Sequence, residues 1–430
     1  MTLPVKYFHS NMQGAPQLSN AWGCMTALLD ACLVTGFNTK AINSITRVAS
    51  VATATISAGH LYEVGQVLSV SGADQAAYNG EVCVVSATTT TFSYAVTGTP
   101  VTPATGSTLS VKVAPLGWEI AFTGTNKRAY RSANILSNRP YLRVDDGLDP
   151  AWTTTYSKYA KVTMAQGMSD IDTFVGARAP FDAAFPTRNE VGTGSGANAY
   201  GGWHKWYYSK ADGGPVNGQA DSYSAPGDFN RAWVIIGDDR GFYLTNQWGS
   251  STGTLGAHCF TDFESYRTAD GFNTLLAATD AWITATSIVS GQGPDSNQNF
   301  ARTCDYVGKV LMRDFTQVGT NVRAGFCTLN TNNNAVCTSG SATGILWPNG
   351  PDYSLILHPV FLKQENSHLR GKMPGLMWIH NNSPSFNHLE VVTDVVGYPG
   401  SKFLLVKVAS ANGYYQELGM LAFDITGPWW

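Results

Sequence analysis

The spacing of hydrophobic side chains changes once along the chain, soon after its beginning. Residues 18–34 (LSNAWGCMTALLDACLV) place apolar side chains three or four positions apart, which predicts an amphipathic helix. Ser19 or Asn20 can cap its start, and Gly36 is suited to end it. Beyond the helix, apolar residues alternate with small polar ones between turn residues, which is the period of half-buried strands. We therefore expect a mainly β protein, a β-rich α+β fold with one N-terminal helix.

The segment from Ile45 to Val113 has a composition of its own. It contains no lysine before Lys112, and strand-like runs such as VLSVS, EVCVVSA and TTTTFSYAV alternate with turn residues. The pair Asn79-Gly80 is typical of a hairpin turn. Because a surface loop accepts an inserted domain at little cost in loop entropy, we expect an inserted small β-barrel or sandwich module. The predicted domains are 1–44, the N-terminal part of the main domain; 45–113, the inserted module; and 114–430, the β-rich main domain.

Residues 114–430 predict one mixed β-rich domain with few helices. In WVIIGDDRGFYL, Trp233 and Ile235 lie on one face of a strand and Val234 and Ile236 on the other, and GDDRG forms the turn to the returning strand. The stretch 265–282 predicts a loop and one helix. The remaining predicted strand pairs are 353–364 with 374–381, around LRGKM, and 401–410 with 418–426.

Charged side chains are scarce in this chain. They make up 13% of its 430 residues, about half the usual share, and the formal net charge is -3. No block of Lys or Arg is suited to follow a phosphate backbone, so we expect no nucleic-acid partner. Because little charge keeps copies apart, the composition fits either an ordinary β-rich protein or a surface that other subunits cover.

The sequence carries no signature of a metal, a cofactor or a membrane span. The eight histidines lack metal-ligand spacing, no C-x-x-C pair occurs, and GTGSG lacks the strand, helix and lysine of a phosphate loop. No apolar run is long enough to cross a bilayer, and no secretory signal is visible at the N-terminus. The seven cysteines predict reduced thiols made in a cytoplasm, and a bridge between Cys327 and Cys337 is left open. We expect no cofactor, no metal and no membrane insertion.

Two pairs of adjacent carboxylates are the obvious candidates for catalysis. They are Asp145-Asp146 and Asp238-Asp239. A glycosidase needs two carboxylates across one bond, whereas neighbouring residues of a strand point to opposite faces. A structural role is therefore the favoured interpretation, with Asp238 and Asp239 satisfying backbone donors in a turn. For a polysaccharide-degrading enzyme, Asp145 and Asp239 would be the first candidates.

Aromatic residues are the candidate interaction residues. The segment 190–228 is far longer than an ordinary connection, and its centre WHKWYY holds four rings: Trp203, Trp206, Tyr207 and Tyr208. These rings are suited to anchor the loop onto its own domain, to form a contact surface, or to stack on a sugar. The chain ends on two further rings, which burial stabilises by roughly 2 kcal/mol each. We expect Trp429 in the protein's own core and Trp430 against a neighbour.

Two sets of residues resemble bacteriophage proteins. The pattern H-x-Y-x-V-G-x-x-x-x-V-S-G-A-x-x-x-x-Y-N-G-x-V, from His60 to Val82, resembles a small all-β module of tail and fibre proteins of tailed bacteriophages. The stretches VKYFHSNMQGAPQLS, GWEIAFTGTNKRAYRS, LRVDD, WVIIGDDRGFYL, LRGKMPGLMW and AFDITGPW resemble a family of phage virion proteins. The resemblance implies a structural role in the particle, and the inserted module favours the tail or baseplate.

These observations together lead to the expected function. We expect a non-enzymatic virion structural protein, assembled in the cytoplasm of the host bacterium and located in the phage tail. Its partners would be further copies of itself and other tail or baseplate proteins. The alternatives are a receptor-binding or glycan-degrading tail protein, whose partner is a glycan of the host surface, and a head decoration protein.

Overall fold

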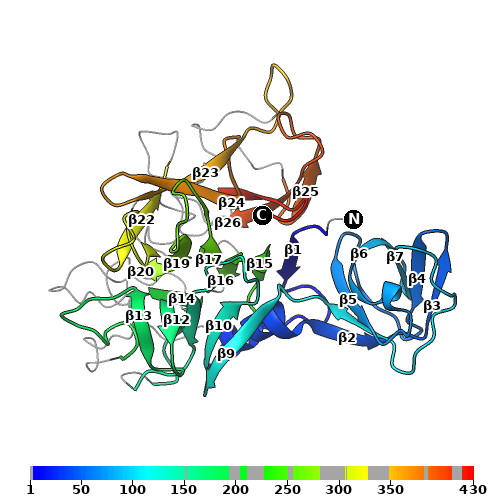
Figure 1. The fold of residues 1–430 in the computed structure, drawn as a ribbon, viewed down its shortest axis with the longest axis horizontal. Helices are drawn as coiled ribbons and strands as arrows, with labels where there is room; N and C mark the ends of the chain where they lie inside the picture. Colours follow the sequence, from blue (N-terminus) through cyan, green and yellow to red (C-terminus); the bar gives the residue numbers. More distant parts are fainter. Residues whose placement is uncertain are drawn as a thin grey trace.

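The protein is mainly β, with three antiparallel sheets and one short helix near the N-terminus (Figure 1). The expected fold class is therefore confirmed. The computed structural model describes residues 3–150, 153–192, 204–210, 227–249, 255–280, 306, 308–327, 348–381, 386–408 and 419–430.

The largest sheet has 13 strands and runs from the N-terminal strand to the C-terminal hairpins. Its strands lie in the order β1 (Lys6–His9), β15 (Trp233–Asp238), β16 (Gly241–Gln247), β17 (Leu255–Asp262), β19 (Thr274–Ala277), β21 (Lys309–Leu311), β22 (Val322–Phe326), β23 (Leu357–Gln364), β24 (Leu369–Ile379), β27 (Gly419–Asp424), β26 (Lys402–Val408) and β25 (Glu390–Thr393), with β18 (Glu264–Ser265) beside β24.

A second sheet of seven strands packs against the first through residues 118–132 and 204–209. Its strands lie in the order β20 (Thr279–Asp280), β14 (His204–Ser209), β12 (Lys158–Met168), β11 (Tyr141–Asp145), β10 (Lys127–Ser132) and β9 (Trp118–Gly124), with β13 (Phe174–Ala179) also beside β12.

The third sheet, also of seven strands, contains only strands from residues 37–113 and stands beside β1 at the right of Figure 1. We call it the module sheet. That segment 45–113 is an inserted domain that folds by itself stays a prediction. The strand order is β2 (Phe37–Ala41), β8 (Ser110–Val113), β5 (Val67–Ser71), β6 (Gly80–Ala87), β7 (Thr91–Ala95), β4 (Val51–Thr55) and β3 (Ser44–Val48), and a 3-10 turn, η2 (Ala76–Tyr78), precedes β6.

Strand β15 divides the hydrophobic interior of the main body into two cores. Trp233 and Ile235 belong to the core that continues into the helix and the module, whereas Val234 and Ile236 face the core of the C-terminal strands. This confirms the predicted two-faced strand and its turn at 237–241. Because successive side chains of a strand point to opposite faces, these two cores cover both faces of the sheet at β15.

The helix begins later than the sequence predicts. It comprises α1 (Cys24–Leu29) and a π-helical continuation, η1 (Asp30–Thr35), and Gly36 with φ 72° ends it as expected. Neither Ser19 nor Asn20 caps it, because the chain enters through Gly23 in a left-handed conformation. Asp146, the residue after β11, accepts hydrogen bonds from the amides of Met25 and Thr26 in the first turn of the helix instead.

Three further predictions are corrected. Asn79-Gly80 is not the hairpin turn, because Gly80 already belongs to β6 and Asn79 bonds the backbone of Ala73. The described part of 265–282 forms strands β18, β19 and β20 instead of a helix. LRGKM belongs to β24 rather than to a turn. The paired strands β23–β24 and β26–β27 are confirmed.

Candidate functional site

The aromatic segment WHKWYY is largely a buried strand. Trp206, Tyr207 and Tyr208 belong to β14 and are at most 1% exposed. The prediction of a continuous loop over 190–228 is therefore wrong at 204–209. Trp203 lies outside the described residues.

The β14 rings are held on both faces of their strand. Trp206 donates a hydrogen bond from Nε1 to the Ala277 carbonyl oxygen at 3.0 Å and stacks on His258, with ring centroids 6.0 Å apart. Tyr207 packs edge-on to Tyr159 on the other face. Of the alternatives that the sequence left open, the structure supports anchoring within the protein's own fold for Trp206, Tyr207 and Tyr208. They offer no contact surface to a partner.

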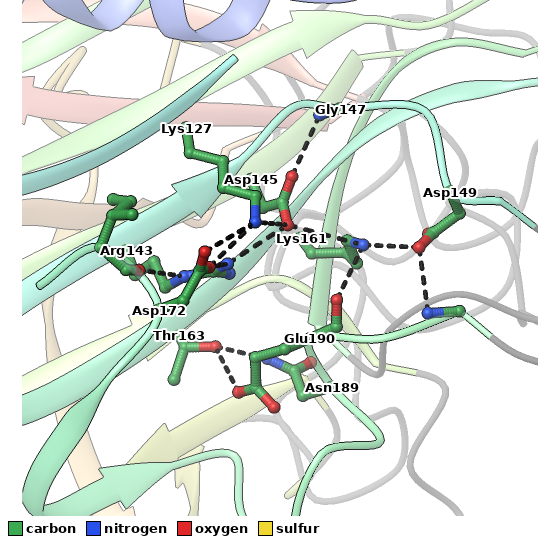
Figure 2. A network of polar contacts seen from close by, with 12 residues as sticks. Lys127, Arg143, Asp145, Gly147, Asp149, Lys161, Thr163, Asp172, Asn189 and Glu190 are labelled. Atoms are coloured by element: carbon green, nitrogen blue, oxygen red, sulfur yellow. Dashed lines mark hydrogen bonds and ion pairs between the residues drawn. The ribbon is translucent and has the colours of Figure 1, made fainter. Parts of the chain in front are cut away.

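The candidate carboxylate Asp145 lies in a network of buried charges on β10, β11 and β12 (Figure 2). Its Oδ2 lies 3.3 Å from Arg143 Nη2, 3.7 Å from Lys161 Nζ and 3.9 Å from Lys127 Nζ. Its Oδ1 accepts a hydrogen bond from the Gly147 amide at 3.2 Å. Three cations and a backbone donor therefore hold this carboxylate in place, as in a structural ion-pair network.

Asp172 completes the exposed end of this network. It bonds Arg143 Nη2 at 2.5 Å and Lys127 Nζ at 2.9 Å. Although burial acts to raise it, the pKa of Asp172 is lowered from its ordinary value by the hydrogen bonds from Lys127 and Arg143. This carboxylate is therefore charged at neutral pH.

Lys161 extends the network inward. Its ammonium group bonds Asp149 Oδ1 at 2.7 Å and the carbonyl oxygen of Glu190 at 2.9 Å, and both Lys161 and Asp149 are almost fully buried. Asp149 also accepts hydrogen bonds from the Tyr159 hydroxyl at 3.1 Å and the Gly192 amide at 3.0 Å. Each polar atom of this inner pair has a partner, which is the condition for burying an ion pair at all.

Glu190 and Asn189 connect the network to β14. Asn189 donates from Nδ2 to Thr163 Oγ1 at 2.6 Å and accepts at Oδ1 from the His204 amide at 2.9 Å. Thr163 donates in turn to Glu190 Oε1 at 3.2 Å. Burial raises the pKa of Glu190, against the opposing effect of Arg178 and Arg143. No sequence pattern indicates this connection, because its members come from three distant segments.

Asp146 points the opposite way from Asp145 and has a different environment. It is fully buried, and its Oδ2 accepts hydrogen bonds from the Met25 amide at 2.8 Å and the Thr26 amide at 3.4 Å. Burial raises the pKa of Asp146 to about 8, against the opposing effect of the Tyr208 hydroxyl and the helix amides. The prediction that the two residues of this pair point to opposite faces holds, and Asp146 joins the helix to the second sheet.

Asp238 and Asp239 form the turn between β15 and β16, as expected from their sequence. Asp238 Oδ1 accepts hydrogen bonds from the amides of Arg240 at 2.8 Å and Gly241 at 3.1 Å. Burial raises the pKa of Asp238 to about 6, while these backbone bonds act to lower it. The second sheet holds the turn in place, since Trp118 Nε1 bonds the Asp238 carbonyl oxygen at 3.0 Å and Asn134 Nδ2 bonds Asp239 Oδ1 at 3.1 Å.

An open cleft of about 390 Å³ lies beside this turn, where the main body meets the module. We call it the junction cleft. Asp145 does not line it, so the structure does not bring Asp145 and Asp239 together at one site. Its walls are Leu3, Pro4, Val5, Lys6, Glu81, Leu116, Asn134, Leu136, Gly237, Asp238, Asp239, Arg240, Pro428 and Trp430.

The two terminal tryptophans have different environments at this cleft. Trp429 is half-buried against the C-terminal core, where its Nε1 bonds the Asp424 carbonyl oxygen at 2.8 Å and its ring meets Tyr243 edge-on. Trp430 is 38% exposed, and the Arg240 guanidinium lies 3.8 Å from its ring centroid. Trp430 therefore presents an aromatic ring to the cleft.

The described residues contain no group of three metal-ligating side chains and no helix long and apolar enough to cross a membrane. Cys337 lies outside the described residues, so its pairing with Cys327 stays open. A scan against protein-family models matched no family, and a search of curated proteins matched none. Function is therefore inferred from the sequence and the geometry of this chain.

Proposed function

We propose that this chain is a non-enzymatic structural protein of a tailed-phage particle. It is built in several copies into the tail or baseplate and contacts both its own copies and other virion proteins. The sequence resemblance to phage virion proteins and to the phage tail module supports this proposal. The surface of the module sheet is the structural observation that carries it.

The few charged side chains of the module, residues 45–113, all of which the structure describes, are held by contacts within the chain. Two of them fix the module to β1, since Glu81 lies 2.6 Å from Lys6 and Glu63 lies 4.0 Å from His9. The others contact backbone or hydroxyl groups: Arg47 with the carbonyls of Ala49 and Pro100, Asp74 with Thr105, and Lys112 with the Thr35 carbonyl.

Aliphatic side chains, in contrast, point from the module into solvent. Val48 is 80% exposed, and five further large aliphatic residues of the module are exposed as well. Single exposed aliphatic residues are normal on a protein, whereas exposed aliphatic residues that lie together are typical of a contact surface, and Val48 and Val51 are paired at the end of the β3–β4 hairpin. Covering such a surface removes apolar area from water and desolvates few charges. These residues are Val48, Val51, Leu61, Val64, Val85 and Val101.

Two alternatives, a glycan-degrading tail protein and a head decoration protein, are less well supported. The first would need two carboxylates across one bond, and Asp145 is bound by three cations away from the cleft that holds Asp239. For the second, nothing in the geometry separates head from tail. The assembly proposal needs neither a reactive group nor a cofactor.

Immunogold labelling of intact particles against this chain tests the proposal directly. Label on the tail or baseplate is the expected result, and label on the capsid would instead support a head decoration protein. Absence of the chain from purified particles would contradict all structural roles. As a control for enzymatic function, purified protein should leave the viscosity of host polysaccharide unchanged.

A further inference from the structure

The junction cleft combines apolar walls with a net negative charge, since its lining holds two cations and three carboxylates. Lys6 forms an ion pair with Glu81, another wall residue, at 2.6 Å, and Arg240 lies 3.3 Å from Asp262 and against the Trp430 ring. Within the described residues, no cationic side chain forms an ion pair with Asp238 or Asp239. The cleft is therefore suited to an apolar group that carries one positive charge.

Leu136 and the ring of Trp430 form the accessible apolar part of the cleft. Leu136 is 76% exposed, and the adjacent Ile135 is 81% exposed. Both belong to the short connection after β10, which Asn134 ties to the Asp239 carboxylate. An exposed aliphatic pair on a tethered loop is a preformed contact site, because little backbone entropy is lost when a partner covers it.

The outer tip of the module is apolar and carries one positive charge, which complements the apolar, negatively charged junction cleft. The hairpin β3–β4 turns through Ala49 and Ser50 between the paired residues Val48 and Val51. Beside it lies Val101, which is 68% exposed. We call this group, with Arg47, the module tip.

Arg47 both stiffens the module tip and gives it a positive charge. Its guanidinium donates to the carbonyl oxygens of Pro100 at 3.1 Å and Ala49 at 2.6 Å, and its amide donates to Thr102 Oγ1 at 2.8 Å. A guanidinium has five N–H donors, so further donors remain for a carboxylate. Among the fully described residues 45–113, the only other Lys or Arg is Lys112, whose ammonium group bonds the Thr35 carbonyl.

The geometry points to a head-to-tail contact in which the module tip of one copy docks into the junction cleft of the next. Val48, Val51 and Val101 would lie against Leu136 and Trp430, and Arg47 would reach Asp239. This inference rests on the proposed assembly function and names the partner: a second copy of this chain. Apolar burial with one charge pair is the usual composition of an interface hot spot.

This contact has to form between copies. The module tip residues are absent from the lining of their own junction cleft, and Figure 1 shows β3 and β4 at the outer end of the module with β1 on its inner side. Two different surfaces that meet head-to-tail produce a closed ring where the rotation closes, and a helical filament where it does not. Both arrangements occur as repeated structures, which is what a tail or baseplate requires.

Sedimentation velocity over a concentration series tests the contact. Val48→Asp and Leu136→Asp change exposed side chains on opposite sides of the proposed interface, and each should weaken self-association by roughly tenfold or more. Val318→Asp, at a side chain 62% exposed and outside both surfaces, is the matched control and should associate like the wild type. Equal association of all four proteins would overturn the inference.

Charge reversal and cross-linking give independent readouts. Arg47→Glu and Asp239→Arg should each weaken association, and the double variant should recover it, because the reversed charges again attract. A Val48→Cys, Leu136→Cys protein should form disulfide-linked ladders on oxidation, whereas a protein with only one of these two introduced cysteines should not. Failure of both the rescue and the ladder in a protein that still labels on the tail would refute the contact and leave the proposed function intact. A wild-type protein that stays monomeric and is absent from particles would contradict both.

Discussion

The carboxylate oxygen Oδ1 of Asp146 lies 2.6 Å from the hydroxyl oxygen of Tyr208, in the fully buried interior between the helix and the second sheet. The Tyr208 hydroxyl has one proton but faces two acceptors, since the Ala21 carbonyl oxygen lies 3.1 Å away. If Asp146 is protonated, its O–H donates to Tyr208 and Tyr208 donates to Ala21, so every group is satisfied. This arrangement agrees with the pKa of about 8 that burial gives Asp146.

Replacing Asp146 by Asn should therefore increase stability in a pH-dependent manner. The unfolded carboxyl has a pKa near 3.9, so between about pH 4 and pH 8 the folded state binds one more proton than the unfolded state. The wild-type stability should fall as the pH rises through this window, by at most about 1.4 kcal/mol per pH unit from this group. The amide introduced by Asp146→Asn keeps the acceptor for Met25 and the donor to Tyr208 without titrating. Thermal unfolding should give similar melting temperatures near pH 4 and a growing advantage of the variant up to pH 8.

Asp146→Ala is the matched control for that experiment. It removes the acceptor for the Met25 and Thr26 amides, so at every pH it should be less stable than Asp146→Asn, by roughly 1–3 kcal/mol for each buried amide left unpaired. If Asp146→Asn and Asp146→Ala behaved alike, Asp146 would not organise the helix start.

Burial on both faces did not by itself hide a strand from the sequence. β15 is buried on both faces, but its run of aromatic and β-branched residues, Trp233 to Ile236, leads directly into the turn GDDRG and so indicates a strand. All six residues of β14 are buried, so HKWYYS shows no polar face, and its glycine-rich flanks favour a loop. The helix start was missed for a related reason: its capping carboxylate is Asp146, 121 residues from Met25 along the chain, and no local pattern encodes such a contact.

Among the candidate sites, too, contacts between residues close in the sequence were predictable and contacts between distant residues were not. The turn role of Asp238 is local, because its carboxylate bonds amides two and three residues ahead, and Asx turns are visible in a sequence. The partners of Asp145 and the junction cleft are products of tertiary folding, and the sequence shows neither. That a protein lacking residues 45–113 leaves a folded, soluble remainder stays a prediction. The hydrophobic core continues from the module into the helix, so this deletion exposes apolar side chains of the remaining body.

Asp238→Asn should stabilise the protein at neutral and alkaline pH. Because burial raises the folded-state pKa of Asp238 to about 6, the carboxyl destabilises the fold progressively as the pH rises from about 4 to about 6, and by a constant amount above. An Asn side chain still accepts the Arg240 and Gly241 amides. We expect a gain on the order of 1–2 kcal/mol at pH 7.5 and no gain at pH 4, measured by denaturant unfolding. Asp238→Ala, which loses the turn bonds, should be less stable than Asp238→Asn at both pH values.

Lys161→Met should be among the most destabilising single changes in the second sheet. It leaves Asp149 charged and almost fully buried without its cation, a situation that costs roughly 3–5 kcal/mol. Lys127→Met is the matched control, because Lys127 is 30% exposed at the edge of the same network and should cost about 1 kcal/mol or less. Adding Asp149→Asn to Lys161→Met should recover part of the loss. Equal effects of the two lysine changes on the urea midpoint would show that the inner pair is not a specific ion pair.

Gly375→Ala should displace Trp429 from the C-terminal core. Gly375, in β24, has φ 62°, a conformation that costs other residues roughly 1–2 kcal/mol, and an added Cβ would overlap the Trp429 indole nitrogen. The ring cannot yield without breaking its hydrogen bond to the Asp424 carbonyl oxygen and its edge contact with Tyr243. We expect a total loss of roughly 2–4 kcal/mol together with a change in near-ultraviolet circular dichroism. Gly427→Ala, where an added Cβ meets nothing within 4 Å, should leave both readouts unchanged. If Gly375→Ala behaved like Gly427→Ala, Trp429 would not be packed against β24. The position of the neighbouring Trp430 in the lining of the junction cleft would then be wrong as well.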